Sequence, residues 1–229
     1  MTNLQILISF ETEINKINDN VTKPNTDDSL YWLNQAVYKF IKLRFNGDFV
    51  HRTAFEQTEK RREDLIHLYE SKTYEDFTII TSNSDYDQYS VEYPEDFLYV
   101  LHEDVVISDM KDNNVKTTSV FECTTDSFMH RINNSLTDFH YHFHRARPLR
   151  VRNENGCNLL TDKQYKIKSY TLGYLRKPNE ISLENPFDEY TDFTDNVMYE
   201  ITKIAAQMYI ENTQDKRYET ITNEVNTQE

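Results

Sequence analysis

The spacing of hydrophobic and polar residues predicts two helices at the start of the chain. In the first, the apolar residues follow the 3.6-residue period of a helix and share one face: Leu7, Phe10, Ile14 and Ile17. Lys23-Pro24-Asn25 interrupts this pattern. A second helix is predicted over about residues 27–45, because Asp27 and Asp28 suit a first helical turn and Asn46-Gly47 suits a helix end.

Two further helices are predicted, one on each side of the middle of the chain. The third begins at Thr53, where Thr53 and Glu56 fit a capping box, and its apolar face reaches Tyr69. The fourth begins after Thr194, and its apolar face is formed by Val197, Ile201, Ile204, Ala205 and Met208. The chain beyond Asn212 is polar without an apolar face, so we expect it to fray.

Between these helices, from about residue 75 to 177, the pattern changes to that of β-structure. Stretches rich in β-branched and aromatic residues alternate with polar, turn-forming clusters such as Asn153-Glu-Asn-Gly156. The predicted strands are 77–81, 97–107, 115–125, 139–145 and 165–175. Five strands in about 100 residues are typical of an antiparallel sheet, a small barrel or a sandwich.

The order of these elements predicts a single compound α+β fold. The C-terminal helix packs against the three N-terminal helices and completes a helical bundle, from which an inserted antiparallel β region projects. The predicted boundaries are 1–72 for the N-terminal helices, 73–180 for the β-rich insertion and 181–229 for the last helix with its polar tail.

Composition excludes several classes of protein. The 229 residues include 16 Tyr and 13 Phe, enough bulky apolar surface for a core, but no run of about 18 apolar residues that would cross a bilayer. Residues 1–10 lack the basic region and cleavage site of an export signal. The two cysteines, Cys123 and Cys157, are too few for a disulfide framework, so we expect reduced thiols.

Charge is segregated along the chain. Residues 140–177 carry nine basic and two acidic side chains, whereas residues 85–126 and 178–229 each have a net charge of −9. Blocks of opposite sign favour head-to-tail contacts between identical copies, in which the basic patch of one meets the acidic patch of its neighbour. The formal charge of the whole chain, −14, argues against non-specific wrapping of duplex DNA.

The basic block supplies the candidate site residues. We expect an inter-subunit contact formed by Arg145, Arg147, Arg150, Arg152, Arg176 and Lys177. Two alternatives remain open: neutralisation of these charges within one copy, and binding of nucleic-acid phosphates by the strip from Arg145 to Arg152, since guanidinium suits phosphate and carboxylate equally.

The histidines offer a weak metal candidate. On a strand, His140, His142 and His144 would share one face, and imidazole is a zinc ligand, which leaves a metal-dependent enzyme as a further alternative. Three positions spread over about 13 Å do not easily meet on one ion, and a structural or surface role is favoured. No P-loop, nucleophile elbow or dinucleotide-binding motif is present, so we expect no catalytic residue and no cofactor.

Several stretches, taken in order, resemble a family of virion proteins. The chain is similar to tail-connector or adaptor ring proteins of the crAss-like podoviruses, tailed phages of Bacteroides-type hosts. The stretches are Lys23-Pro24-Asn25-Thr26-Asp27-Asp28, Leu30-Tyr31-Trp32-Leu33-Asn34-Gln35-Ala36, Phe55-Glu56-Gln57-Thr58, Arg62-Glu63-Asp64-Leu65, Pro94-Glu95-Asp96-Phe97-Leu98-Tyr99, Gly173-Tyr174-Leu175-Arg176-Lys177-Pro178, Ile201 to Ile210 and Arg217-Tyr218.

The resemblance implies a structural protein and no enzyme. Such proteins look like short helical bundles with β extensions, and they form twelve-fold rings stacked below the portal. The implied partners are further copies of the chain in a dodecameric ring, the portal protein and other tail ring or hub proteins. Genomic DNA would pass through the lumen without sequence-specific binding. The implied location is the virion tail or neck, with the host cytoplasm as the site of assembly and no membrane contact.

Overall fold

The computed structural model describes residues 1–17, 23–46, 59–75, 77–111, 114–141 and 145–213. The chain divides into two compact units. The helical unit comprises Met1–Leu68 with Pro178–Glu229, and the β unit comprises Tyr69–Lys177. This organisation confirms the predicted α+β class, in which N-terminal helices pack against a C-terminal helix and β-sheets lie between them in the sequence.

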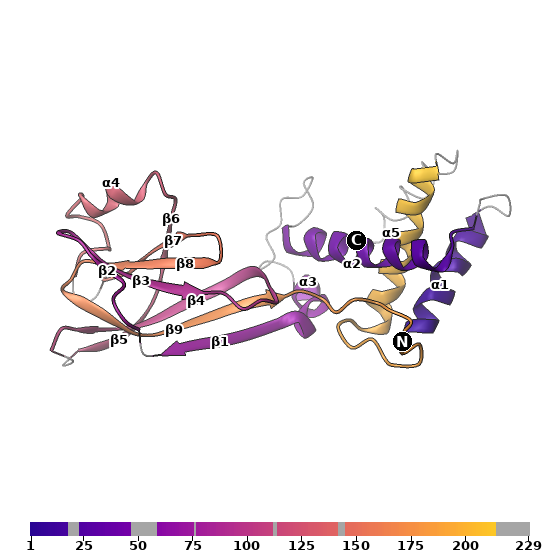
Figure 1. Ribbon diagram of the computed structural model, residues 1–229, viewed down its shortest axis with the longest axis horizontal. Coiled ribbons are helices and arrows are strands. Elements are labelled where there is room, and N and C mark those ends of the chain that lie inside the picture. Colours follow the sequence, from indigo (N-terminus) through magenta and orange to yellow (C-terminus); the bar gives the residue numbers. More distant parts are fainter. Residues whose placement is uncertain (18–22, 47–58, 76, 112–113, 142–144, 214–229) are drawn as a thin grey trace. The chain divides into compact units, whose positions relative to one another are not determined.

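The helical unit is built around its last helix (Figure 1). Its helices are α1 (Asn3–Ile17), α2 (Thr26–Asn46), α3 (Glu59–Asp64), the short 3-10 helix η2 (Ile66–Leu68) and α5 (Asp195–Thr213). Helix α5 packs against both α1 and α2, as the predicted bundle requires. The apolar faces meet in a core in which Phe10, Leu33, Phe40 and Ile201 are buried.

A buried ion-pair network joins three helices of this unit. The guanidinium of Arg44 on α2 lies 3.0 Å from a carboxylate oxygen of Asp64 on α3 and 2.5 Å from one of Glu200 on α5. Arg44 is itself 5% exposed, and its guanidinium carbon lies over the ring of Phe40, 4.8 Å from the centroid. Because a buried guanidinium is costly without partners, these contacts fix the ends of three helices relative to one another.

The β unit contains two sheets (Figure 1). The first is antiparallel, in the order β1 (Tyr69–Glu75), β9 (Tyr165–Arg176), β4 (Phe97–Asp109) and β5 (Val115–Ser119). The second has the order β2 (Thr81–Ser82), β3 (Asp87–Glu92), β8 (Gly156–Thr161), β7 (Leu149–Arg152) and β6 (Phe121–Cys123). Its pairs are antiparallel except β6 with β7, which are parallel.

The two sheets share one core. Buried side chains of β3 and β8, such as Tyr89 and Leu159, pack in the same cluster as those of β4 and β9, such as Val105 and Tyr170. A smaller cluster around Phe139 lies beside the short helix α4 (Phe128–Ile132) and packs on the second sheet. Large aromatic side chains thus supply much of the apolar area that stabilises this unit.

Several predicted boundaries differ from the structure. The second and fourth helices agree with α2 and α5, and the predicted strands 97–107 and 165–175 correspond to β4 and β9. The predicted third helix reaches too far along the chain, since Tyr69 begins β1. Its predicted start at Thr53 lies outside the described residues. The polar tail after residue 213 also lies outside them.

Two predicted strands are wrong. In the stretch 77–81, only Thr81 is part of a strand, β2. In the predicted strand 139–145, residues 139–141 form no strand. Phe139 fills the small cluster beside α4. The neighbouring backbone forms a local hydrogen bond, in which the His140 amide donates to Thr137 O at 3.3 Å. Residues 142–144 of this predicted strand lie outside the described residues.

Candidate functional site

The six predicted contact residues lie in different environments, and the most buried of them is Arg150. This residue projects from β7, is 5% exposed, and has its Nε 3.1 Å from Glu103 on β4 and its Nη2 2.8 Å from Glu122 on β6. Glu103 also accepts a hydrogen bond from the Tyr170 hydroxyl at 2.5 Å. Arg150 is therefore neutralised within its own chain and joins the two sheets of the β unit.

Burial governs the ionisation of this network. Desolvation raises the pKa of the Glu103 carboxyl, while the Tyr170 hydrogen bond and the positive charge of Arg150 act in the opposite direction. Desolvation likewise raises the pKa of the neighbouring Cys157 thiol to about 11. The thiol is thus protonated at neutral pH, and it lies 4.0 Å from the Tyr170 oxygen, as a packed core group.

Arg145 and Arg147 come together with Lys116 in an open cavity of about 570 Å³. We call this the basic pocket; its lining residues are Lys116, Thr118, Ser119, Asp138, Arg145 and Arg147. The backbone amide of Arg147 donates to Asp138 O at 2.7 Å, and its Nη2 donates to Ser119 Oγ at 2.5 Å. Arg145 is exposed and forms no ion pair with any described residue.

The pocket has an excess of positive charge, since three cations face the single carboxylate of Asp138. Backbone and hydroxyl contacts hold Arg147 in place, whereas Arg145 extends into solvent. Such an arrangement suits an anionic group such as a carboxylate or a phosphate, because a guanidinium offers two parallel donors to either.

The remaining predicted contact residues are separate from this pocket. Arg152 is exposed and lies over the ring of Phe97 at 5.7 Å. Arg176 lies 3.4 Å from Glu70 on β1, and the exposed Lys177 donates to the carbonyl oxygen of Glu95 at 2.8 Å. The sequence missed Lys116 as a partner of Arg145, because it is one of only two basic residues in the acidic block 85–126.

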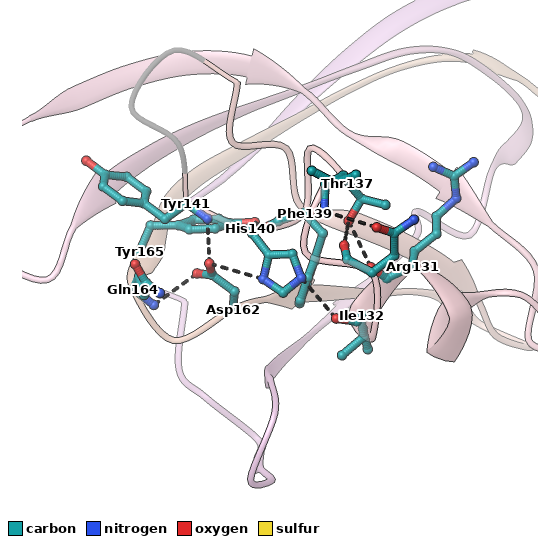
Figure 2. Close-up of polar contacts among 11 residues, drawn as sticks. Arg131, Ile132, Thr137, Phe139, His140, Tyr141, Asp162, Gln164 and Tyr165 are labelled. Atoms are coloured by element: carbon teal, nitrogen blue, oxygen red, sulfur yellow. Dashed lines mark hydrogen bonds and ion pairs between the residues drawn. The ribbon is translucent and has the colours of Figure 1, made fainter.

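His140 braces a turn of the β unit (Figure 2). Its Nε2 lies 2.9 Å from the carbonyl oxygen of Ile132, and its Nδ1 lies 3.9 Å from the Asp162 carboxylate. That carboxylate accepts hydrogen bonds from the backbone amides of Tyr141 and Gln164, and burial raises its pKa. His140 therefore connects the segment beside α4 to the β8–β9 turn.

The other two histidines of the metal candidate, His142 and His144, lie outside the described residues. Within the described part of the chain, no group of three or more His, Cys, Asp or Glu side chains is placed to hold a metal ion. Among the same residues, none of the helices is both long and apolar enough to cross a membrane.

A second charged surface, which the sequence did not single out, precedes α5. We call residues 180–189 the acidic loop; it carries Glu180, Glu184, Asp188 and Glu189 and no basic residue. All four carboxylate side chains are exposed, and between them Phe187 is 77% exposed. The exposed Phe187 thus lies between the exposed carboxylates of Glu184 and Asp188 in the sequence.

Backbone hydrogen bonds fix the acidic loop on the helical unit. The amides of Leu4 and Asn3 donate to the carbonyl oxygens of Pro186 and Asp188 at 2.9 and 3.1 Å. At the other end of the loop, the Asn34 side chain bonds both the amide and the carbonyl oxygen of Ile181, at 2.9 and 3.1 Å. The loop thus has a defined conformation before any partner binds.

A search of curated proteins finds no match. The family model of phage tail ring protein 3/4 matches residues 1–200, which include the β unit, the acidic loop and the start of α5. This match confirms the resemblance to ring proteins of crAss-like phages, and it shows that the chain belongs to the phage tail ring protein 3/4 family.

Proposed function

We propose that this chain forms one ring of the head-to-tail connector, stacked below the portal and surrounding the channel through which genomic DNA passes. The observation that carries this proposal is the family match over residues 1–200. Members of this family are structural components of the phage tail and not enzymes, and a ring protein implies a homo-oligomer. The proposed stoichiometry is dodecameric, and the proposed neighbours are the portal and other tail ring or hub proteins.

Charge supports the connector role over a nucleic-acid-binding role. The formal net charge of −14 gives the chain little general affinity for DNA, so DNA moves past it without being held. Arg150 is buried among carboxylates, which removes it from a continuous phosphate-binding strip. The other predicted contact residues remain proposed contacts with neighbouring subunits: Arg145, Arg147, Arg152, Arg176 and Lys177.

Electron microscopy of the native phage particle tests this proposal. The expected result is a closed ring of this chain on the tail axis, directly below the portal and around the DNA channel. Density for the chain in a tail fibre or in the capsid shell, or its absence from the particle, would contradict the connector role. A ring with a copy number other than twelve would correct the stoichiometry alone.

A further inference from the structure

The chain presents two surfaces of opposite charge, an acidic one in the helical unit and a basic one in the β unit. The acidic loop carries four exposed carboxylates, and the basic pocket gathers Lys116, Arg145 and Arg147. The loop belongs to the helical unit and the pocket to the β unit. Two different surfaces on one chain are what a head-to-tail contact needs, whereas a two-fold contact uses the same surface twice.

The acidic loop has the features of a recognition element. Its backbone is held by hydrogen bonds to residues 3, 4 and 34, so little conformational entropy is lost when it binds. Phe187 stands at a turn closed by a hydrogen bond from the Asp188 amide to Asn185 O at 3.2 Å. An aromatic side chain on a rigid turn, flanked by Glu184 and Asp188, offers a central anchor with charged residues around it.

The basic pocket matches this element in chemistry. Arg145 is exposed, and its flat guanidinium can stack on an aromatic ring while it donates to a carboxylate. Thr118 and Ser119 of β5 add hydroxyl groups to the wall, and Arg147 is held in place by Ser119. The volume of about 570 Å³ accommodates a phenyl ring together with a neighbouring carboxylate.

We infer that the acidic loop of one copy docks in the basic pocket of the next copy, with Phe187 stacked against Arg145 and the Glu184 and Asp188 carboxylates facing Lys116 and Arg147. The inference rests on the proposed ring and names the contact that links neighbouring subunits in it. In a ring, the acidic loop of each copy fills the basic pocket of the next copy, since every copy presents both surfaces to its two neighbours.

A reciprocal charge swap tests the contact in phage particles assembled with the full-length chain. We expect Lys116→Glu with Arg145→Glu, and separately Glu184→Lys with Asp188→Lys, to lower the amount of this chain per particle by at least about tenfold. Combining all four substitutions restores opposite charges and the original net charge, and should return the amount to within about threefold of the natural chain. Quantitative mass spectrometry against another tail protein gives the measurement.

A matched control uses Lys111→Glu with Lys168→Glu, which changes the same number of charges on exposed residues of the same unit outside the pocket. This control should assemble normally. Thermal unfolding of each purified variant shows whether it folds. Normal incorporation of either one-sided variant, or a loss that the four-fold variant does not rescue, would overturn the contact.

An engineered disulfide gives a second, independent measurement. Both native cysteines are buried, so Arg145→Cys with Phe187→Cys introduces the only exposed thiols. In oxidised particles we expect a ladder of covalent multimers on a non-reducing gel, and none from either single-cysteine variant. A disulfide within one copy, or no disulfide at all, would overturn the contact even if a charge variant failed to fold.

The two proposals fail in different ways. If microscopy of natural particles shows no ring of this chain, the connector role itself is wrong. If the ring is present but neither the charge rescue nor the ladder is observed, only the docking of loop and pocket is wrong.

Discussion

At the scale of single residues, two glycines of the β unit occupy positions where a side chain has no room. A Cβ atom at Gly156 would lie 2.0 Å from the carbonyl oxygen of Val91 on the neighbouring strand β3. A Cβ atom at Gly173 would lie 2.0 Å from the imidazole of His102 on β4. The Val91 carbonyl belongs to the backbone of a hydrogen-bonded strand pair and cannot move away easily. The His102 imidazole is a side chain, which can rotate away.

We therefore expect Gly156→Ala to destabilise the chain by about 1–3 kcal/mol through overpacking, and Gly173→Ala to cost less. Urea unfolding of the full chain measures both free energies. The double variant Gly173→Ala with His102→Ala should recover most of the smaller loss, because it removes the obstructing ring. An equal cost at the two glycines, with no recovery in the double variant, would contradict this assignment.

At the scale of elements, residues 178–194, which lie between β9 and α5, are held in the helical unit by hydrogen bonds between side chains and the backbone. Asn34 on α2 bonds the amide and carbonyl of Ile181, and the buried Asp192 carboxylate accepts from the amide and the side chain of Asn179 at 2.6 and 3.0 Å. The Tyr190 hydroxyl adds a hydrogen bond to Asn179 O at 2.7 Å. These contacts order a segment that has almost no secondary structure of its own.

Replacing Asn34 with alanine should loosen this segment. Two backbone groups of Ile181 lose their partner, and Ile181 is buried, so we expect a loss of about 1–3 kcal/mol. The measurement is urea unfolding together with the rate of limited proteolysis within residues 178–194. Gln35→Ala, at the exposed adjacent position of α2, is the control and should change neither. Unchanged proteolysis in the Asn34 variant would show that other contacts suffice.

The elements also show what the sequence could and could not predict. Helices α2 and α5 were predicted because their apolar faces are continuous and their first turns carry acids. Strand β1 was missed because, on the edge of its sheet, it buries almost nothing and lacks alternation. Strand β8 was missed for the opposite reason, since nearly every residue of Gly156–Thr161 is buried.

The candidate site could be predicted only in part for a related reason. Counting charges located the basic block that contains Arg145 and Arg147. It could not show that Arg150 is neutralised by Glu103, because that pair depends on how β4 and β7 face each other across two sheets. Nor could it place Lys116 beside Arg145, since the two residues are far apart in the sequence and meet only in the folded unit.

At the scale of the whole molecule, buried tyrosines are concentrated in the β unit. Desolvation raises the pKa of each hydroxyl in this set: Tyr74, Tyr89, Tyr93, Tyr165, Tyr170 and Tyr174. For Tyr74 the pKa rises from 10.0 to about 12. The folded β unit thus holds protons that the unfolded chain releases at a lower pH.

This difference predicts alkaline unfolding. Below pH 10 the stability from these hydroxyls is fully present, and it is lost as the pH rises through 10 toward the raised values, because only the unfolded chain ionises there. Circular dichroism and tyrosinate absorbance, followed together, should show loss of β-structure coinciding with ionisation of the buried tyrosines. Tyr74→Phe should move the transition to higher pH. Complete tyrosine ionisation near pH 10 with the β-structure intact would contradict the prediction.

The two ends of the β unit lie side by side. Its first strand and its last strand are paired along their whole shared length, with Tyr69 opposite Leu175. The points where the polypeptide enters and leaves this unit are therefore only about 5 Å apart, as in any antiparallel pair. A short turn from Leu68 to Pro178 would span that separation, so we expect the helical unit to tolerate removal of the β unit, or its exchange for another module whose two ends lie equally close together.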